Sequence, residues 1–319
     1  MDLDRIYSLV YRNRMTSIVN ECARDFWTEY QPGFRVSDEP VGTPEFYSAV
    51  QRDRYLLEPD IPEMADFRSW RGHDVLEAGC GIATDGAQFA GAGAHYTGID
   101  FSPTAVRLAR QRFEMQGLGG RFVQGSIVEL PFDDASFDLV YSMGVIHHLP
   151  DTERAVSEFH RVLRPGGRVI VMVYHRDSFN YRFTILTLRR AFVLLLLMPD
   201  GPRVVARLTR ERPDVLEGHR QLLRERGRSY LRDRRLFLSN NTDGPGNPLS
   251  KVYGREDARR LFAQFEEVRA TVRFLHLRSY PGGARLARTS LAQRLGSRWG
   301  WHLWIEARKA ETPGHGSHT

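Results

Sequence analysis

A glycine-rich turn between a strand-like and a helix-like segment is the first feature of this sequence that could do chemistry. Residues 75–90 read VLEAGCGIATDGAQFA, with Gly79, Cys80 and Gly81 at the turn. Glycines permit a tight turn and let a ligand approach the backbone closely. The helix that follows presents free N–H groups and the positive end of its dipole. The segment therefore predicts a nucleotide-type binding turn.

An acidic residue ends the next predicted strand. Asp100 stands 21 residues after Gly79, where a carboxylate can accept hydrogen bonds from ribose hydroxyls. Dinucleotides and S-adenosylmethionine both fit this arrangement. The dinucleotide fingerprint, however, needs a small residue where Thr84 stands, and Glu77 would repel a pyrophosphate while suiting a cationic ammonium group. The balance favours S-adenosylmethionine as the cofactor.

Two adjacent histidines, His147 and His148, follow another predicted strand. A histidine titrates near neutral pH and can remove a proton from a hydroxyl or an amine, so either is a candidate catalytic base. A structural role, such as capping the next turn, is the alternative. Ser142 and Met143 close the preceding strand, and we expect them beside the cofactor.

Substrate-side residues are expected where a later strand ends. Tyr174 and His175 leave that strand at the same end of the sheet, and Tyr253 is expected to join them in binding substrate. The polar segment 239–248 could line the pocket too, although its turn-forming residues need no further function. Nearer the N-terminus, Tyr47 is predicted on a helix that could close over the cofactor.

These residues require a particular set of elements to position them. Short apolar runs alternate with helical patterns, which predicts a parallel sheet with helices on both faces. The fold class is therefore α/β: a doubly wound, Rossmann-like sheet of seven mostly parallel strands. The predicted strands are 74–79, 95–100, 121–126, 137–143, 167–174, 265–276 and 298–309, and the predicted helices are 84–92, 103–116, 151–163 and 255–265.

The chain divides into five expected parts. They are an N-terminal helical extension (1–70), a cofactor-binding core (71–174), a helical insertion (175–250), the C-terminal part of the sheet (251–309) and a disordered tail (310–319). The insertion is too long for a simple connection and is predicted to form a lid or an oligomer interface. Its apolar stretch 183–198 is too short and too charged to span a membrane. We expect it to pack on the sheet or to form a homodimer interface.

Composition narrows the function classes. The 319 residues suffice for a full core, and the two cysteines, Cys22 and Cys80, suit a reducing cytoplasm. The first residues do not resemble a signal peptide, so we predict a cytoplasmic protein. The net charge is +6, but only two of the 45 basic residues are lysines, which indicates codon bias. We therefore consider nucleic acid an unlikely partner and interpret the arginine-rich stretch 220–235 as a solvated face. The sequence has no metal-ligand spacing, so we expect no metal.

The motifs together resemble a known family. Glu77-x-Gly79-Cys80-Gly81-x-Ala83 is similar to the first motif of class I S-adenosylmethionine-dependent methyltransferases, in the branch similar to ubiquinone/menaquinone-biosynthesis enzymes. GIDFSP (98–103), LPFDDASFDLVYSMGVIHHLPD (130–151) and VLRPGGRVIVMVY (162–174) resemble the later motifs.

The resemblance implies roles for several residues. Asp100 would hold the ribose, and Phe101 would flank the adenine. Ser126, next to Ile127, replaces the aspartate that would accept from the adenine amino group. Ala83 replaces a third glycine, which is tolerable if its φ is negative.

The implied function is methylation of a small-molecule acceptor in secondary metabolism, with the insertion as a lid. An RNA- or protein-modifying methyltransferase, or a fold recruited to non-methyl chemistry, is the alternative.

Overall fold

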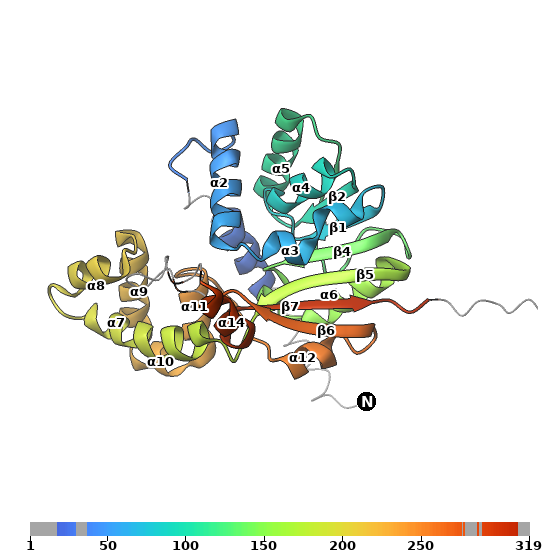
Figure 1. The fold of residues 1–319 in the computed structure, drawn as a ribbon. Helices are drawn as coiled ribbons and strands as arrows, with labels where there is room; N and C mark the ends of the chain where they lie inside the picture. Colours follow the sequence, from blue (N-terminus) through green and yellow to red (C-terminus); the bar gives the residue numbers. More distant parts are fainter. Residues whose placement is uncertain (1–17, 30–36, 276, 278–285, 287–288, 312–319) are drawn as a thin grey trace, which may run out of the picture.

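A seven-stranded sheet forms the centre of the molecule, in the order β3-β2-β1-β4-β5-β7-β6 (Figure 1). The computed structural model describes residues 18–29, 37–275, 277, 286 and 289–311. β7 runs antiparallel to β5 and β6, and the other neighbouring strands are parallel. The predicted α/β fold with a doubly wound, mostly parallel sheet is therefore confirmed.

The strands follow the predicted segments closely. They are β1 (Asp74–Ala78), β2 (His95–Asp100), β3 (Arg121–Gln124), β4 (Phe137–Met143), β5 (Leu163–Tyr174), β6 (Glu266–Arg273) and β7 (His302–Arg308). Two strand starts differ by four residues from the prediction: β5 was expected to begin at residue 167, and the last strand at residue 298. The chain around 298 belongs instead to α14 (Ser290–Trp299), which Thr289 caps by accepting a hydrogen bond from the Ala292 N–H.

Helices cover both faces of the sheet (Figure 1). On one face, α4 (Thr84–Gly91) and α5 (Pro103–Gln116) bury Phe89 and Phe113 against the strands. On the other face, α6 (Thr152–Val162) and α12 (Arg255–Leu261) pack into a second apolar cluster, with a single turn, η2 (Ile146–His148), leading into α6. The sheet is thus buried on both sides, as parallel sheets are.

The predicted insertion forms a helical lobe beside the carboxyl ends of the strands. It contains the π-helix η3 (Asn180–Arg189), α7 (Arg190–Leu195), α8 (Gly201–Thr209), α9 (Pro213–Arg226), α10 (Arg228–Arg232) and α11 (Arg234–Thr242). Ile185, Tyr230 and Phe237 bury their side chains in a core of the lobe's own, which Trp301 joins from the edge of the sheet. None of the helices in the described part of the chain combines the length and hydropathy needed to cross a bilayer.

The N-terminal extension lies over the sheet. Its described part comprises a helical segment, 18–29, followed by α2 (Pro44–Leu57), α3 (Ile61–Ala65) and the 3-10 helix η1 (Phe67–Trp70). Thr43 caps α2, because its hydroxyl accepts from the Phe46 N–H at 3.2 Å and Pro44 occupies the first turn. The predicted disordered tail lies outside the described residues beyond 311.

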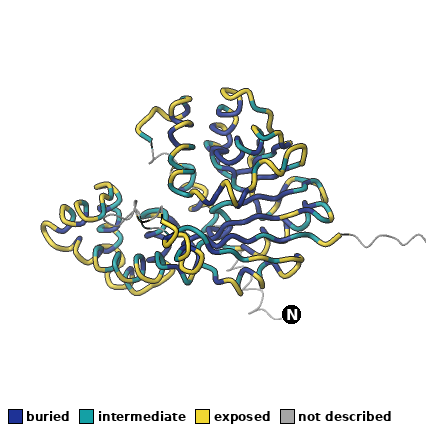
Figure 2. Tube along the Cα trace, viewed as in Figure 1, coloured by how far each residue is buried: buried dark blue, intermediate teal, exposed yellow. Residues whose placement is uncertain are grey.

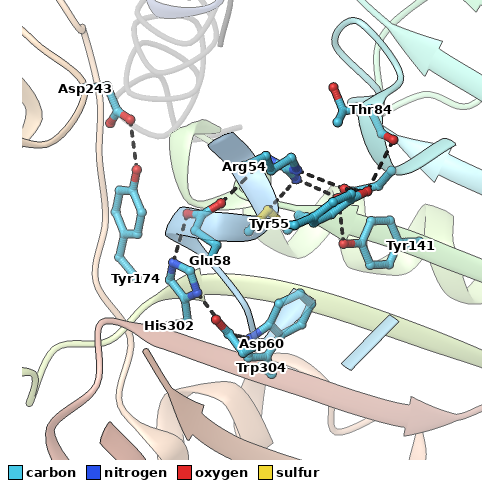
Figure 3. A network of polar contacts seen from close by, with 12 residues as sticks. Arg54, Tyr55, Glu58, Asp60, Thr84, Tyr141, Tyr174, Asp243, His302 and Trp304 are labelled. Carbon is cyan, nitrogen blue, oxygen red and sulfur yellow. Dashed lines mark hydrogen bonds and ion pairs between the residues drawn. The ribbon is translucent and has the colours of Figure 1, made fainter. Parts of the chain in front are cut away.

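A buried histidine ties this extension to the last strand (Figure 3). His302 on β7 lies 3.2 Å from an oxygen of Asp60 and 3.4 Å from an oxygen of Glu58. Trp304 donates its indole N–H to the same Asp60 oxygen at 2.8 Å. Burial alone would lower the pKa of His302, but its hydrogen bonds to Asp60 and Glu58 raise that pKa from 6.5 to about 9. The charged imidazole therefore holds two carboxylates of the extension against the sheet.

The stability of the protein should depend on the charge of His302. A raised pKa in the folded state contributes stability that is complete below the unfolded pKa and is lost as pH rises through the folded pKa. The free energy of unfolding should therefore fall by about 3 kcal/mol between pH ~6.5 and ~9 through this group. His302→Gln should remove that part of the slope in denaturant titrations, whereas His73→Gln, at an exposed position, should keep it. Equal slopes for wild type and His302→Gln would contradict this.

Candidate active site

The glycine-rich turn lies between β1 and α4, as predicted. Gly79 and Gly81 have φ of +80° and +51°, conformations that favour glycine. A Cβ on Gly79 would lie 2.5 Å from a methyl of Val145, whereas a Cβ on Gly81 would meet no described atom within 4 Å. Gly79 is therefore required by packing, and Gly81 presents its backbone to open space.

Ala83 departs from its expected conformation. The replacement of the third glycine was considered tolerable with a negative φ, but the φ of Ala83 is +52° and the residue caps α4 from the left-handed region. The turn must reverse direction here for the Ala83 N–H to reach the Cys80 carbonyl at 2.8 Å. A left-handed residue with a Cβ costs about 1–2 kcal/mol, so the turn stores strain next to the site.

Asp100 braces the turn from the end of β2. One carboxylate oxygen accepts from the Gly81 N–H and the other from the Ser102 N–H, each at 2.9 Å. Burial raises the pKa of Asp100, while these two backbone donors act in the opposite direction. Each carboxylate oxygen can accept more than one hydrogen bond, so the group can still bind a hydroxyl of a ligand.

Two cavities meet at this turn. The strand-end cavity, of about 850 Å³, lies beyond the carboxyl ends of β1 to β4, the usual ligand position in open α/β sheets. The lid cavity, of about 840 Å³, lies between the turn and the helical lobe. Both volumes are typical of small-molecule sites. The residues that line both cavities are Arg54, Glu58, Gly79, Gly81, Met143, Asp243 and Trp301.

A largely buried ion pair lies where the cavities meet, and Figure 3 shows the Arg54 side chain of this pair near Tyr55 and Tyr141. Arg54 on α2 donates two hydrogen bonds to Asp85 on α4, at 2.8 and 2.6 Å. Tyr55 and Tyr141 donate their hydroxyls to the same carboxylate at 3.0 and 2.9 Å. Burial alone would raise the pKa of Asp85, but Arg54 and the two hydroxyls lower it. The Arg54 guanidinium also lies 2.9 Å from the sulfur of Met143.

Glu77 contributes a second buried carboxylate to the lid cavity. It accepts a hydrogen bond from the Tyr96 hydroxyl at 2.6 Å. Burial and the neighbouring charge of Asp85 raise the pKa of Glu77. A cationic ligand group beside this carboxylate would favour its charged form, so the site selects for positive charge at this point.

The comparisons with known proteins agree with this geometry. Residues 76–171 match a family described as Methyltransferase domain. A probable S-adenosylmethionine-dependent methyltransferase of Mycolicibacterium smegmatis is 38% identical over 34% of this chain and 41% of its own length. A phthiotriol/phenolphthiotriol dimycocerosates methyltransferase of Mycobacterium leprae is 39% identical over 31% of this chain and 36% of its own. A demethylmenaquinone methyltransferase of Thermus thermophilus is 39% identical over 26% and 37%. The chain thus matches less than half the length of these relatives.

Residues 76–171 form a class I S-adenosylmethionine-dependent methyltransferase domain. Most of the residues predicted from its motifs line the two cavities. The strand-end cavity is lined by Gly79, Gly81, Asp100, Phe101, Ser126, Ile127, Met143, His148 and Tyr174. Glu77 and Cys80 line the lid cavity.

Two predicted cofactor residues of the methyltransferase domain line neither cavity. The Tyr47 hydroxyl donates to the Leu108 carbonyl at 2.7 Å, which fastens α2 to α5. The Ser142 hydroxyl donates to the Ala78 carbonyl at 2.8 Å, which joins β4 to β1. Both side chains satisfy backbone groups within the buried core, and the cofactor contacts expected of them stay predictions.

Two predicted substrate residues also lie outside the cavities. His175 donates a ring N–H to the Gly300 carbonyl at 3.0 Å, and the Tyr253 hydroxyl lies 3.0 Å from that of Thr152. The two residues form a β-bridge with each other, so they extend the sheet. Their side chains make hydrogen bonds within the protein, and the substrate contacts expected of them stay predictions.

The two histidines after β4 differ in their environments. His148 lines the strand-end cavity, and its Nδ1 donates to the Leu249 carbonyl at 2.8 Å. That bond leaves Nε2 as the available acceptor in the neutral ring, and Nε2 lies 3.7 Å from an Asp243 oxygen. Asp243 also accepts from the Tyr174 hydroxyl at 2.8 Å. A base, a carboxylate and a phenol thus lie together at the cavity wall.

His147 does not reach either cavity. Its ring is fully buried, with its centroid 3.9 Å from that of Tyr174 and 4.2 Å from that of His148. Neither ring nitrogen has a hydrogen-bond partner among the described residues. Burial, and then the neighbouring His148, lower the pKa of His147 well below 6.5. His147 is thus a packing residue held neutral, and of the two candidate bases only His148 is in position.

Sequence reasoning missed several lining residues of the methyltransferase site. The segment 239–248 was interpreted mainly as a turn, but Ser239–Thr242 continue α11, which Asp233 caps. Asn241, Thr242 and Asp243 therefore face the lid cavity. The acid in the first turn after the glycines, Asp85, was the available signal for the buried ion pair. No group of three or more His, Cys, Asp or Glu side chains that could hold a metal occurs among the described residues.

Loss of the Asp85 charge should destabilise the protein. In Asp85→Asn the Arg54 guanidinium would stay buried beside a neutral amide, and breaking such a pair costs about 3–5 kcal/mol. Arg52 and Asp53 form a more exposed pair nearby, so Asp53→Asn is the matched control and should cost less than about 1 kcal/mol. Urea unfolding measures both. A loss below about 1 kcal/mol for Asp85→Asn would contradict the assigned role of this pair.

Proposed function

We propose that this protein transfers a methyl group from S-adenosylmethionine to a small-molecule acceptor. One observation carries the proposal. Within the methyltransferase domain, Asp100 holds the Gly81 N–H at the end of β2, and the backbone of Gly81 faces open space between two cavities. In this arrangement the Asp100 carboxylate would hold the ribose of the donor, next to a turn whose backbone a ligand can approach closely.

The residues of the strand-end cavity suit the donor in chemical type. The Asp100 carboxylate would accept from the ribose hydroxyls, and Phe101 and Ile127 would contact the adenine. The hydroxyl of Ser126 would accept from the adenine amino group. Glu77, where the lid cavity meets the turn, would bind the ammonium of the methionine moiety. When bound, the donor supplies an electrophilic methyl group on a sulfonium.

His148 is the residue that we propose moves a proton. It lines the strand-end cavity, and its Nδ1–H bond to the Leu249 carbonyl fixes the ring orientation and leaves Nε2 as the acceptor. The Asp243 carboxylate lies where it would stabilise the imidazolium after Nε2 has taken a proton. The acceptor's hydroxyl or amine would lie between His148 and the junction of the cavities. It would become nucleophilic because it gives a proton to His148.

The lid cavity is the proposed acceptor site. It opens onto the shared residues Gly79 and Met143, and its lobe side carries Ile185, Leu188 and Phe192. Such a wall encloses an acceptor of substantial apolar area and excludes water from the reaction. The relatives named for phthiotriol and demethylmenaquinone support a small-molecule acceptor. We therefore place the protein with enzymes of secondary metabolism.

Donor binding should depend on the charge of Asp100. In Asp100→Asn the amide group cannot accept from both backbone N–H groups and a ribose, and charge-assisted hydrogen bonds contribute about 1.5–3 kcal/mol each. Isothermal titration should therefore show at least about tenfold weaker binding of S-adenosylmethionine and S-adenosylhomocysteine. Asp133→Asn, an exposed position outside the cavities, should bind as wild type does. Wild-type protein that binds neither compound at millimolar concentration would refute the proposed function.

Substitutions of the two histidines should have different effects on kcat in a turnover assay. With labelled S-adenosylmethionine and a panel of phenols, quinols and amines, His148→Ala should lower kcat about 10²–10⁴-fold, the contribution of a general base. Its affinity for S-adenosylhomocysteine should stay within a few-fold of wild type. His147→Asn should lower the free energy of unfolding and spare kcat per folded molecule. Unchanged turnover in His148→Ala would contradict its role as the base.

A further inference from the structure

The outer end of the helical lobe carries a set of exposed apolar side chains. They lie at the end of α7, in the turn after it and on α8, where Figure 2 shows mainly exposed chain. Their exposed fractions run from 39% to 59%. We call them the lid-tip patch: Leu194, Leu195, Leu197, Met198, Val204 and Leu208.

The packing of the lobe does not use these side chains. Leu196, Val205 and Leu216 already form a small buried core between α7, α8 and α9, with Phe192 against it. The lid-tip patch points away from that core. Grouped exposed apolar side chains on a soluble domain mark an interaction surface more often than isolated ones do.

Arginines flank the patch on α8. Val204 and Leu208 lie four residues apart on one stripe of the helix, and Arg203 and Arg207 lie four residues apart on the adjacent stripe. Arg210, which ends the helix, is exposed as well. A helix with an apolar stripe beside a basic one lies in the interface of a bilayer, with its apolar side chains among the lipids and its cations at the headgroups.

The patch is continuous with the lid cavity. Leu208 is 58% exposed and also lines that cavity, next to Phe192. Arg189 and Glu211 form an ion pair on the same wall, and Arg189 also donates to Asn241 on α11. This part of the cavity wall is therefore held beside the patch by contacts within the lobe.

We propose that the lid-tip patch docks on the surface of an anionic phospholipid bilayer. The charge beside the patch favours an anionic bilayer over a second copy of this chain. A second copy would bring Arg203, Arg207 and Arg210 against the same cations, whereas anionic headgroups neutralise them. Docking would turn the mouth of the lid cavity toward the lipid. The identity of the acceptor is the only part of this proposal that rests on the proposed function. If that function holds, the acceptor is an apolar molecule dissolved in the bilayer.

Vesicle co-sedimentation of the full chain, without methyl donor or acceptor, tests the docking separately from catalysis. The protein should sediment with phosphatidylcholine–phosphatidylglycerol vesicles, much less with phosphatidylcholine alone, and progressively less as salt is raised. Leu197→Ser/Met198→Ser should weaken partitioning at least about tenfold. Arg203→Gln and Arg207→Gln should each weaken it about fivefold.

Matched controls lie elsewhere on the surface. Met115→Ser/Leu291→Ser alters side chains that are 48% and 56% exposed on α5 and α14, and this variant should partition as wild type does, as should Arg259→Gln on α12. Equal losses in the controls, or no binding to anionic vesicles, would overturn the proposal. A dimer in sedimentation velocity that Leu197→Ser/Met198→Ser dissociates would overturn it too, since the patch would then be a subunit interface.

Discussion

The buried ion pair between Arg54 and Asp85 is the interaction on which the rest of the site depends. It joins α2 of the N-terminal extension to the first turn of α4, directly after the glycine-rich turn. Two tyrosine hydroxyls, one from α2 and one from β4, also donate hydrogen bonds to Asp85. A buried pair of this kind offsets its desolvation cost only when every partner is in place. The extension, the turn and β4 are therefore fixed relative to one another, and both cavities share the resulting wall.

Much of the fold followed from the sequence because its signals are local. Alternating apolar runs and capped helices predicted the order of the elements, and Ser102 and Pro103 mark the start of α5 where it was expected. The turn at Gly79 and the acid at Asp100 were predicted for the same reason, since their spacing is fixed by one strand-turn-helix unit. The mostly parallel sheet of seven strands also agrees with the resemblance to the family, while the role of the insertion as a lid stays a prediction.

The expected site residues that line neither cavity have partners that are distant in the chain. Tyr47, Ser142 and Tyr253 were expected in the site, but each gives its hydroxyl to the core. No local pattern distinguishes a hydroxyl that meets a ligand from one that meets a carbonyl 60 residues away. Asp243 lies in the segment 239–248, which was offered as a possible pocket lining, but its turn-like sequence did not indicate a position between the two cavities. The homodimer and the cytoplasmic location stay predictions.

A crystal structure with S-adenosylhomocysteine tests the central claim most directly. The account predicts that the ribose hydroxyls bind the Asp100 carboxylate, that the adenine lies beside Phe101 and Ile127, and that the sulfur lies where the two cavities meet, near Gly79 and Met143. The lid cavity would then stay open for an acceptor next to the sulfur. A ligand whose adenine and ribose lie within the lid cavity, or that leaves Asp100 without a contact, would contradict the account.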